Sequence, residues 1–167
     1  MPLRRSRGDP APDSPRAVLL VPLGAKASRT AIRQARDLAD GGPIAVLALL
    51  KIYGYSLGMP NPGLLPTAKE REVQRAVVAD AIAGLERLGC DVDGQVAMTR
   101  HPARMITAVA RNRGVHHVIV EQPKVSQVRR FMEGDMIASL HRRLGSSVEI
   151  VVLDTAPAPK MRAKPAR

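Results

Sequence analysis

Aromatic residues and cysteine are scarce in this sequence. Its 167 residues include no Trp, one Phe and two Tyr, so a folded core has to be built from Val, Leu, Ile and Ala. The chain therefore offers almost none of the stacking platforms that hold single-stranded nucleic acid. Cys90 is the only cysteine, which excludes an internal disulfide, a two-cysteine metal site and an internal redox pair.

Long hydrophobic runs are also missing. The longest uninterrupted apolar run, residues 44–50, is far shorter than the roughly 20 residues of a membrane-spanning helix. Arg4 and Arg5 resemble the start of a twin-arginine signal, but prolines and aspartates occupy residues 9–13, where such a signal needs an apolar stretch. A single cysteine is typical of a reducing compartment. We therefore expect a soluble, cytoplasmic protein.

Positive charge exceeds negative charge, with 26 Lys and Arg against 15 Asp and Glu. The net charge of +11 is spread out, because residues 1–16 carry +2 and residues 156–167 carry +4, which leaves +5 elsewhere. Such a surface can attract nucleic acid or anionic lipid. No nucleic-acid motif accompanies it, and we expect the charge to act on solubility. Proline-rich basic tails at 1–16 and 155–167 are predicted to be disordered around one domain at 17–154.

Five short apolar runs recur between these tails. Their length and their content of Val, Ile and Leu are typical of strands. Several are almost continuously apolar, which favours strands covered on both faces, as in a parallel sheet. The predicted strands are residues 17–23, 44–52, 93–98, 115–122 and 147–153.

The segments between these runs have the periodicity of amphipathic helices. Ser28 can cap the first helix, and Pro102 suits the first position of the third. Each connection is long enough for a right-handed crossover, so the sequence predicts an α/β domain with a parallel sheet. Met98, Met105 and Met136 lie in apolar stripes and are expected to fill the core. The predicted helices are residues 28–39, 67–89, 102–114 and 134–143.

Several short motifs occur in a fixed order between residues 17 and 153. They are Val21-Pro22, the small-residue helix at 28–39, Leu-Leu-Lys-Ile at 49–52, Pro102 to Ile106, Val-Ile-Val at 118–120, and the pair 134–140 and 147–153. In this order and spacing the chain resembles the universal stress protein family. The resemblance implies a flavodoxin-like (adenine nucleotide alpha hydrolase-like) fold, with a five-stranded parallel sheet in the order 3-2-1-4-5 and helices on both faces. It also implies a ligand crevice between strands 1 and 4.

ATP-binding members of that family carry Gly-x-x-Gly, nine residues, and then Gly-Ser or Gly-Thr. This motif wraps backbone amides around phosphates. The strand 1 aspartate of those members falls on Gly24 here, and only Gly134 keeps a motif glycine. The resemblance places the ATP-site positions at Gly24, Ile52, Glu121, Lys124, Gly134 and Asp135.

These substitutions change the chemistry of the predicted site. Glu121 brings a side chain and a negative charge to a place where backbone should approach phosphate. Asp135 puts a carboxylate at a helix N-terminus, where it can satisfy the free amides itself. Lys124 acts in the opposite direction, since lysine can bind phosphate as a point charge. We predict no cofactor, with ATP held by Lys124 and Gly134 as the alternative.

No catalytic arrangement is evident in the sequence. His116 and His117 are adjacent, so in a strand they point to opposite faces and cannot bind one metal together. His101 precedes Pro102 at a helix start, and His141 is expected to face solvent. We therefore expect no metal site and no enzymatic activity.

Three functions remain open. The first is a non-enzymatic stress-response or regulatory module that acts through protein contacts. The second is a nucleotide-binding switch or weak ATPase at the crevice between strands 1 and 4, and the third is a basic protein associated with nucleic acid. The last strand should lie at a sheet edge, so we also predict a homodimer through Val148, Ile150 and Val152. An unknown protein partner fits the first function, and nucleic acid is not the expected partner.

Overall fold

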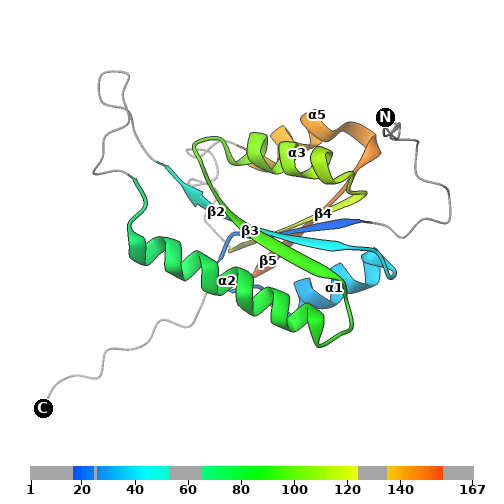
Figure 1. The fold of residues 1–167 in the computed structure, drawn as a ribbon. Helices are drawn as coiled ribbons and strands as arrows, with labels where there is room; N and C mark the ends of the chain where they lie inside the picture. Colours follow the sequence, from blue (N-terminus) through cyan, green and yellow to red (C-terminus); the bar gives the residue numbers. More distant parts are fainter. Residues whose placement is uncertain (1–16, 25, 53–64, 124–134, 156–167) are drawn as a thin grey trace, which may run out of the picture.

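The computed structural model describes residues 17–24, 26–52, 65–123 and 135–155 (Figure 1). The predicted tails at 1–16 and 155–167 lie outside these residues, except for Thr155, which is the last residue of β5. The elements along the chain are β1 (Val18–Pro22), α1 (Arg29–Ala39), β2 (Ile44–Lys51), α2 (Ala68–Glu86), β3 (Val92–Thr99), α3 (Pro102–Arg113), β4 (His117–Pro123), α5 (Met136–Leu144), a 3-10 turn (Gly145–Ser147) and β5 (Glu149–Thr155).

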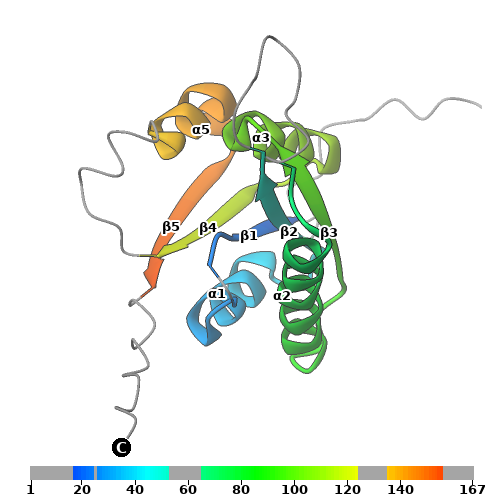
Figure 2. The ribbon, with the colours of Figure 1, turned by 90° about the vertical axis from the view of Figure 1, so that its left-hand side faces the viewer.

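All five strands are parallel and form one sheet in the order β3-β2-β1-β4-β5. Helices α1 and α2 cover one face of the sheet, while α3 and α5 cover the other (Figure 2). The predicted flavodoxin-like α/β fold and its strand order are therefore confirmed. Every residue of the central strand β1 is buried, as its continuous apolar run predicted.

Local sequence signals explain where the helices begin and end. The Ser28 Oγ accepts a hydrogen bond from the Ala31 N–H at 3.1 Å and caps α1. Helix α2 begins with a capping box between Thr67 and Glu70. Helix α3 has Pro102 in its first turn and ends at Gly114, whose φ of +60° lies in the left-handed region that glycine tolerates best.

Most of the predicted boundaries shift by one or more residues. Strand β5 begins at Glu149 and not at residue 147, because residues 145–147 form the 3-10 turn that follows α5. Helix α2 ends at Glu86, three residues before the predicted end at Gly89. Among the residues that the structure describes, no helix is long and apolar enough to cross a membrane.

The expectation that all three methionines fill the core is wrong for Met98. Met105 and Met136 pack partly buried against the apolar cluster under α3 and α5. Met98, however, is 49% exposed. The reason is its place on β3, because an edge strand has a neighbouring strand on one side only.

Strand β5 lies at the opposite sheet edge, as predicted. Val148 and Ile150 pack against the cluster under α3 and α5, whereas Val151 and Leu153 pack against the cluster on the other face. Of Val148, Ile150 and Val152, only Val152 is an exposed large apolar residue. Two of the three residues predicted to form a dimer surface are thus partly used within the domain itself.

Candidate functional site

The carboxyl ends of β1 and β4 form the candidate site. The two strands are neighbours in the sheet, with Pro22 opposite Glu121, and the Leu23 N–H donates to the Glu121 carbonyl at 2.8 Å. The chain leaves β1 towards α1 on one face, while α5, the next described helix after β4, lies on the other face. Open parallel sheets bind ligands where consecutive connections diverge in this way.

A buried carboxylate from the chain itself lies in this crevice. The Glu121 side chain is only 1% exposed. Its two carboxylate oxygens accept hydrogen bonds from one donor, the Ser28 N–H, at 3.1 and 3.0 Å. Glu121 therefore links the end of β4 to the start of α1, across 93 positions of sequence.

Ser28 uses both its backbone and its side chain at this helix end. Its N–H binds Glu121, while its Oγ caps α1 through the Ala31 N–H. The N-terminus of a helix carries a partial positive charge and free N–H groups, which is why anions bind there. In this chain the Glu121 carboxylate already occupies that favourable position.

The start of α5 is also satisfied by a carboxylate of the chain. The Asp135 Oδ1 accepts a hydrogen bond from the Ala138 N–H at 2.9 Å, which is the helix cap that the sequence predicted. Unlike Glu121, Asp135 is exposed. The two helix starts nearest to the crevice therefore each hold a negatively charged side chain.

The other predicted site positions are placed as follows. Gly24 lies in a bend two residues after Pro22, and a Cβ added there would meet no atom within 4 Å. Ile52 directly follows β2, and its N–H donates to the Thr99 carbonyl at 2.9 Å. Lys124 and Gly134 lie outside the described residues. The structure thus brings Gly24 and Glu121 to neighbouring strand ends.

Sequence reasoning treated Glu121 as a substituted motif position and missed its contact with Ser28. A signal was present, because Glu121 is a charged residue directly after the apolar run Val118 to Val120. A carboxylate that continues a buried strand needs hydrogen-bond donors. The sequence alone did not indicate which donor would be close.

Comparison with known proteins places this fold. No family model and no curated protein sequence matches the chain. A universal stress protein in complex with cAMP aligns over 85% of this chain and 99% of its own, with 15% identity and a TM-score of 0.58. A protein from the universal stress protein family of Burkholderia pseudomallei aligns over 81% and 94%, with 18% identity and a TM-score of 0.55. The chain has the universal stress protein fold.

A third structure with the universal stress protein fold comes from Archaeoglobus fulgidus, in complex with dAMP. It aligns over 83% of this chain and 98% of its own, with 14% identity and a TM-score of 0.53. Identities this low establish the shared arrangement of strands and helices. Such low identities do not identify a ligand of this chain, which has to be inferred from its own residues.

The histidines of this universal stress protein fold lie at different places in the domain. The His117 side chain is buried at the start of β4, and its Nε2 lies 3.1 Å from the Glu149 Oε2. His101 precedes α3 and His141 is exposed on α5, both as predicted. Within the described part of the chain, no group of three or more His, Cys, Asp or Glu residues is arranged to hold a metal ion.

Two hollows occur elsewhere on the domain. One, of about 220 Å³, lies at the amino ends of the strands and is lined by residues including Asp91, Asp93 and Arg113. There the Arg113 Nη1 lies 2.6 Å from the Asp93 Oδ1. The other, of about 460 Å³, lies between α2 and β3. Neither hollow is lined by Glu121.

Proposed function

We propose that this chain is a non-enzymatic regulatory module of the universal stress protein type, which acts in the cytoplasm through protein contacts. It does not bind ATP in the manner of the ATP-binding members of that family. The shared fold supports the type of module. The position of the Glu121 carboxylate supports the loss of ATP binding.

That carboxylate is the observation on which the proposal rests. It is buried at the carboxyl end of β4 and holds the Ser28 N–H at the start of α1. A phosphate that entered the same place would meet a like charge. At 4 Å and an effective dielectric near 20, two unit charges repel by about 4 kcal/mol. Binding there would also have to break the contact between Glu121 and Ser28.

A nucleotide-binding switch is the second candidate function. Solved neighbours with the same fold are complexes with cAMP and with dAMP, and each of these ligands carries a single phosphate. One phosphate meets less repulsion than the triphosphate of ATP. Lys124 would supply a positive charge near such a ligand.

Titration with nucleotides separates the two functions. We expect no heat of binding and no shift in melting temperature when ATP-Mg, AMP, cAMP or dAMP is added at millimolar concentration. A ligand that binds only the folded state raises stability by RT ln(1 + [L]/Kd), so even weak binding would be visible. Micromolar affinity of the unmodified protein for any of the four would contradict the proposal and favour the switch.

Variants test whether Glu121 is the cause. Glu121→Gln retains an oxygen for the Ser28 N–H and removes the charge, whereas Glu121→Gly also opens space. The combined variant Gly24→Asp, Glu121→Gly, Lys124→Gly and Asp135→Ser restores the family motif, and we expect it to gain ATP binding. Either single change at Glu121 or Asp135 should gain less, because the other carboxylate remains. If the folded combined variant stays unable to bind ATP, Glu121 and Asp135 are not the barrier.

A further inference from the structure

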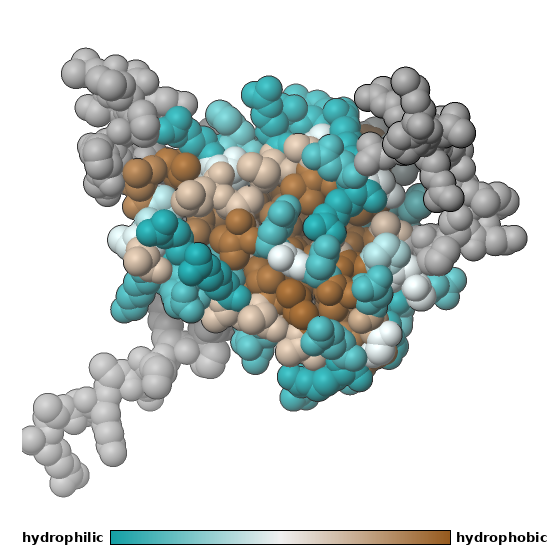
Figure 3. Space-filling view, in the orientation of Figure 1, coloured by the Kyte–Doolittle hydropathy of each residue, from teal (hydrophilic) through white to brown (hydrophobic). Residues whose placement is uncertain are grey.

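A groove between α2 and β3, here called the α2/β3 groove, lies on the side of the molecule opposite to β5. It has a volume of about 460 Å³. Its lining is mainly apolar and includes Leu50, Val78, Ile82 and Val96. Met98 lines it too, with about half of its surface exposed. Figure 3 views this side of the molecule and shows hydrophobic surface gathered across its centre.

The free backbone edge of β3 borders this groove. The Ile44 N–H donates to the Asp91 carbonyl and the Ile52 N–H to the Thr99 carbonyl, both at 2.9 Å. The odd-numbered residues from 91 to 99 therefore direct their backbone groups towards β2. Alternation along the strand directs the N–H and C=O of the four even-numbered residues outwards. These four are Val92, Gly94, Val96 and Met98.

Strand β3 lacks the features that usually keep a sheet edge from pairing. Exposed edges are commonly short or carry lysine, proline or a bulge. Strand β3 has eight residues, all of them in register with β2, and contains neither lysine nor proline. Its one charged residue, Asp93, is already paired with Arg113. The edge is thus long, regular and open within the described part of the chain.

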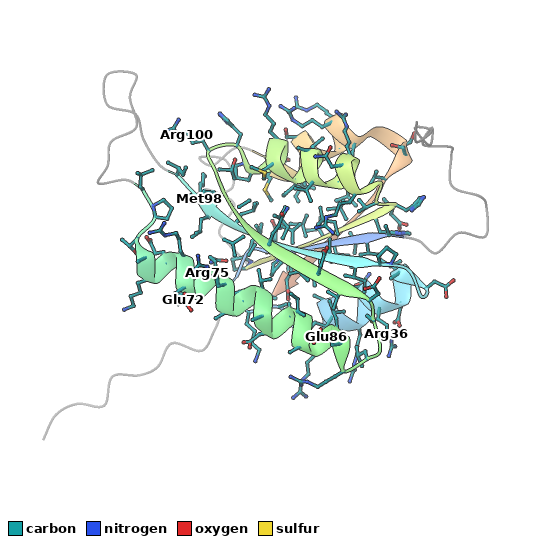
Figure 4. All side chains as sticks on the ribbon, viewed as in Figure 1. Arg36, Glu72, Arg75, Glu86, Met98 and Arg100 are labelled. Atoms are coloured by element: carbon teal, nitrogen blue, oxygen red, sulfur yellow. The ribbon has the colours of Figure 1, made fainter. Side chains whose placement is uncertain are left out.

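The charged residues that line the groove all have one sign. Arg71 and Arg75 lie on α2 and line it, and no carboxylate does. Figure 4 shows Arg75 on α2 and Met98 on β3 on the same side of the molecule. The Arg75 Nη1 lies 3.4 Å from the Glu72 Oε2, and both side chains are at least 70% exposed. An ion pair as open as this contributes little and exchanges readily for another carboxylate.

The spacing of the arginines fits a strand. Residues four apart on a helix are separated by about 6 Å along its axis. Alternate residues of a strand, whose side chains share one face, are separated by about 6.6 Å. A strand added beside β3 can therefore direct two acidic side chains, two positions apart, at Arg71 and Arg75. Its next side chains on that face would meet the apolar lining.

We propose that the α2/β3 groove binds an extended segment of a partner protein, which adds to the sheet beside β3. The segment carries two acidic residues at alternate positions, followed by apolar residues on the same face. Main-chain hydrogen bonds to β3 supply affinity, and the arginines and the apolar lining supply selectivity. This inference deepens the proposed function, because it names a surface for the protein contacts.

A labelled peptide tests the groove. The probe is Glu-Thr-Glu-Thr-Ile-Thr-Val-Thr, which places Glu, Glu, Ile and Val on one face of a strand. We expect saturable binding to the full chain, measured by fluorescence anisotropy. Hydrogen exchange should show new protection at the amides of Val92, Gly94, Val96 and Met98. Binding that protects the β5 amides instead, or no saturable binding, would overturn the proposal.

Two pairs of charge reversals provide matched variants. Arg71→Glu with Arg75→Glu should weaken peptide binding by more than about tenfold, because like charges then face each other in the complex. Arg29→Glu with Arg33→Glu makes the same change in net charge, at the same spacing, on exposed residues of α1. This second pair should leave the affinity within about twofold. Equal losses in both pairs would show that only net charge matters and would reject the groove.

Two further measurements complete the test. Met98→Pro removes one outward N–H without touching the bonds to β2, and proline is tolerated at such edge positions. It should weaken peptide binding, and the charge reversals keep the test decisive if this variant does not fold. Self-association that protects the same four amides without peptide would overturn the proposal in favour of a second copy of this chain. The nucleotide titrations are independent, so a failure of peptide binding is distinguishable from a failure of the ATP argument.

Discussion

The two edges of the sheet, β3 and β5, differ in the side chains that surround them. On β5, Ile150 packs under α3 and α5, and the Asp154 Oδ1 accepts a hydrogen bond from the Gln122 Nε2 of the neighbouring strand β4 at 3.0 Å. Strand β5 also carries two carboxylates within seven residues. Strand β3 is longer by one residue, has a glycine at its third position, and exposes Met98 beside a groove with two arginines. The two edges of one sheet can thus offer different surfaces to different partners.

The contrast matters for the predicted homodimer. Pairing of two β5 edges stays a prediction, and it depends on the outward backbone groups of that strand together with Val152. Met98 on β3 is 49% exposed and Val152 on β5 is 36% exposed. Only the groove beside β3 is lined by Arg71 and Arg75. A second copy of this basic chain fits β5 better than β3, because arginines in the α2/β3 groove favour an acidic segment.

The largest effect is expected when the packing of α2 on β3 is broken at Gly94. A Cβ there would lie 2.6 Å from the Val78 Cγ1 and 3.2 Å from the Val46 carbonyl oxygen. Gly94→Ala should therefore push α2 away from β3 and lower the free energy of unfolding by about 1–3 kcal/mol. Urea denaturation followed by circular dichroism measures this change.

Gly24→Ala is the matched control for that substitution. No atom lies within 4 Å of a Cβ at Gly24, and its φ is not in the left-handed region. Its stability should stay within about 0.5 kcal/mol of the unmodified protein. Equal stability of the Gly94→Ala and Gly24→Ala variants would show that the close approach of α2 to β3 is not needed.

A smaller effect on the fold, but a clear effect on assembly, is expected from proline at Val152 on β5. The Glu149 N–H donates to the His116 carbonyl at 2.8 Å, so odd-numbered residues of β5 face β4 and even-numbered residues face outwards. Val152→Pro removes an outward N–H and should convert a β5-paired dimer to a monomer in sedimentation. Val151→Pro removes a bond to β4 and should cost about 1–3 kcal/mol of stability. A folded Val152→Pro variant that remains dimeric would contradict pairing through β5.

The sequence was sufficient to predict the fold, because an apolar run recurs at each strand and an amphipathic segment follows between the runs. Nearly continuous apolar runs predicted the parallel strands, and Ser28, Thr67, Pro102 and Gly114 marked helix ends through local hydrogen bonds and backbone geometry. Such signals act over a few residues, so a single sequence contains them. Met98 was wrongly placed in the core, because an apolar stripe does not reveal whether a strand has a neighbour on both sides.

The candidate site was less predictable, because its main contact is not local in the sequence. The contact between Glu121 and Ser28 joins residues 93 positions apart, and it depends on the exact approach of α1 to the end of β4. The sequence indicated that Glu121 was unusual for an ATP site. It did not indicate that the carboxylate would be buried and bonded to a helix start.

The smallest effect expected concerns pH and the first turn of α2, just before the arginines of the α2/β3 groove. The Glu70 carboxylate accepts hydrogen bonds from the Thr67 N–H at 2.6 Å and from the Thr67 Oγ at 2.9 Å. These bonds, the backbone one first, hold the pKa of Glu70 below its usual value of 4.5. Because the folded state lowers this pKa, the carboxylate stabilises α2 fully above pH 4.5, and this contribution is lost as the pH falls through the lowered pKa.

Glu70→Gln is the variant that isolates this effect. Glutamine can keep the bond to the Thr67 N–H but has no charge to lose. The stability difference between the unmodified protein and Glu70→Gln should be constant from pH 7 to about pH 5 and should change progressively below pH 4.5. Amide exchange of β5 serves as the reference, and it should not differ between the unmodified protein and Glu70→Gln as the pH falls. Carbon-13 titration of the Glu70 carboxyl group measures the pKa directly. A value at or above 4.5 would show that the capping box does not hold the charged form of Glu70.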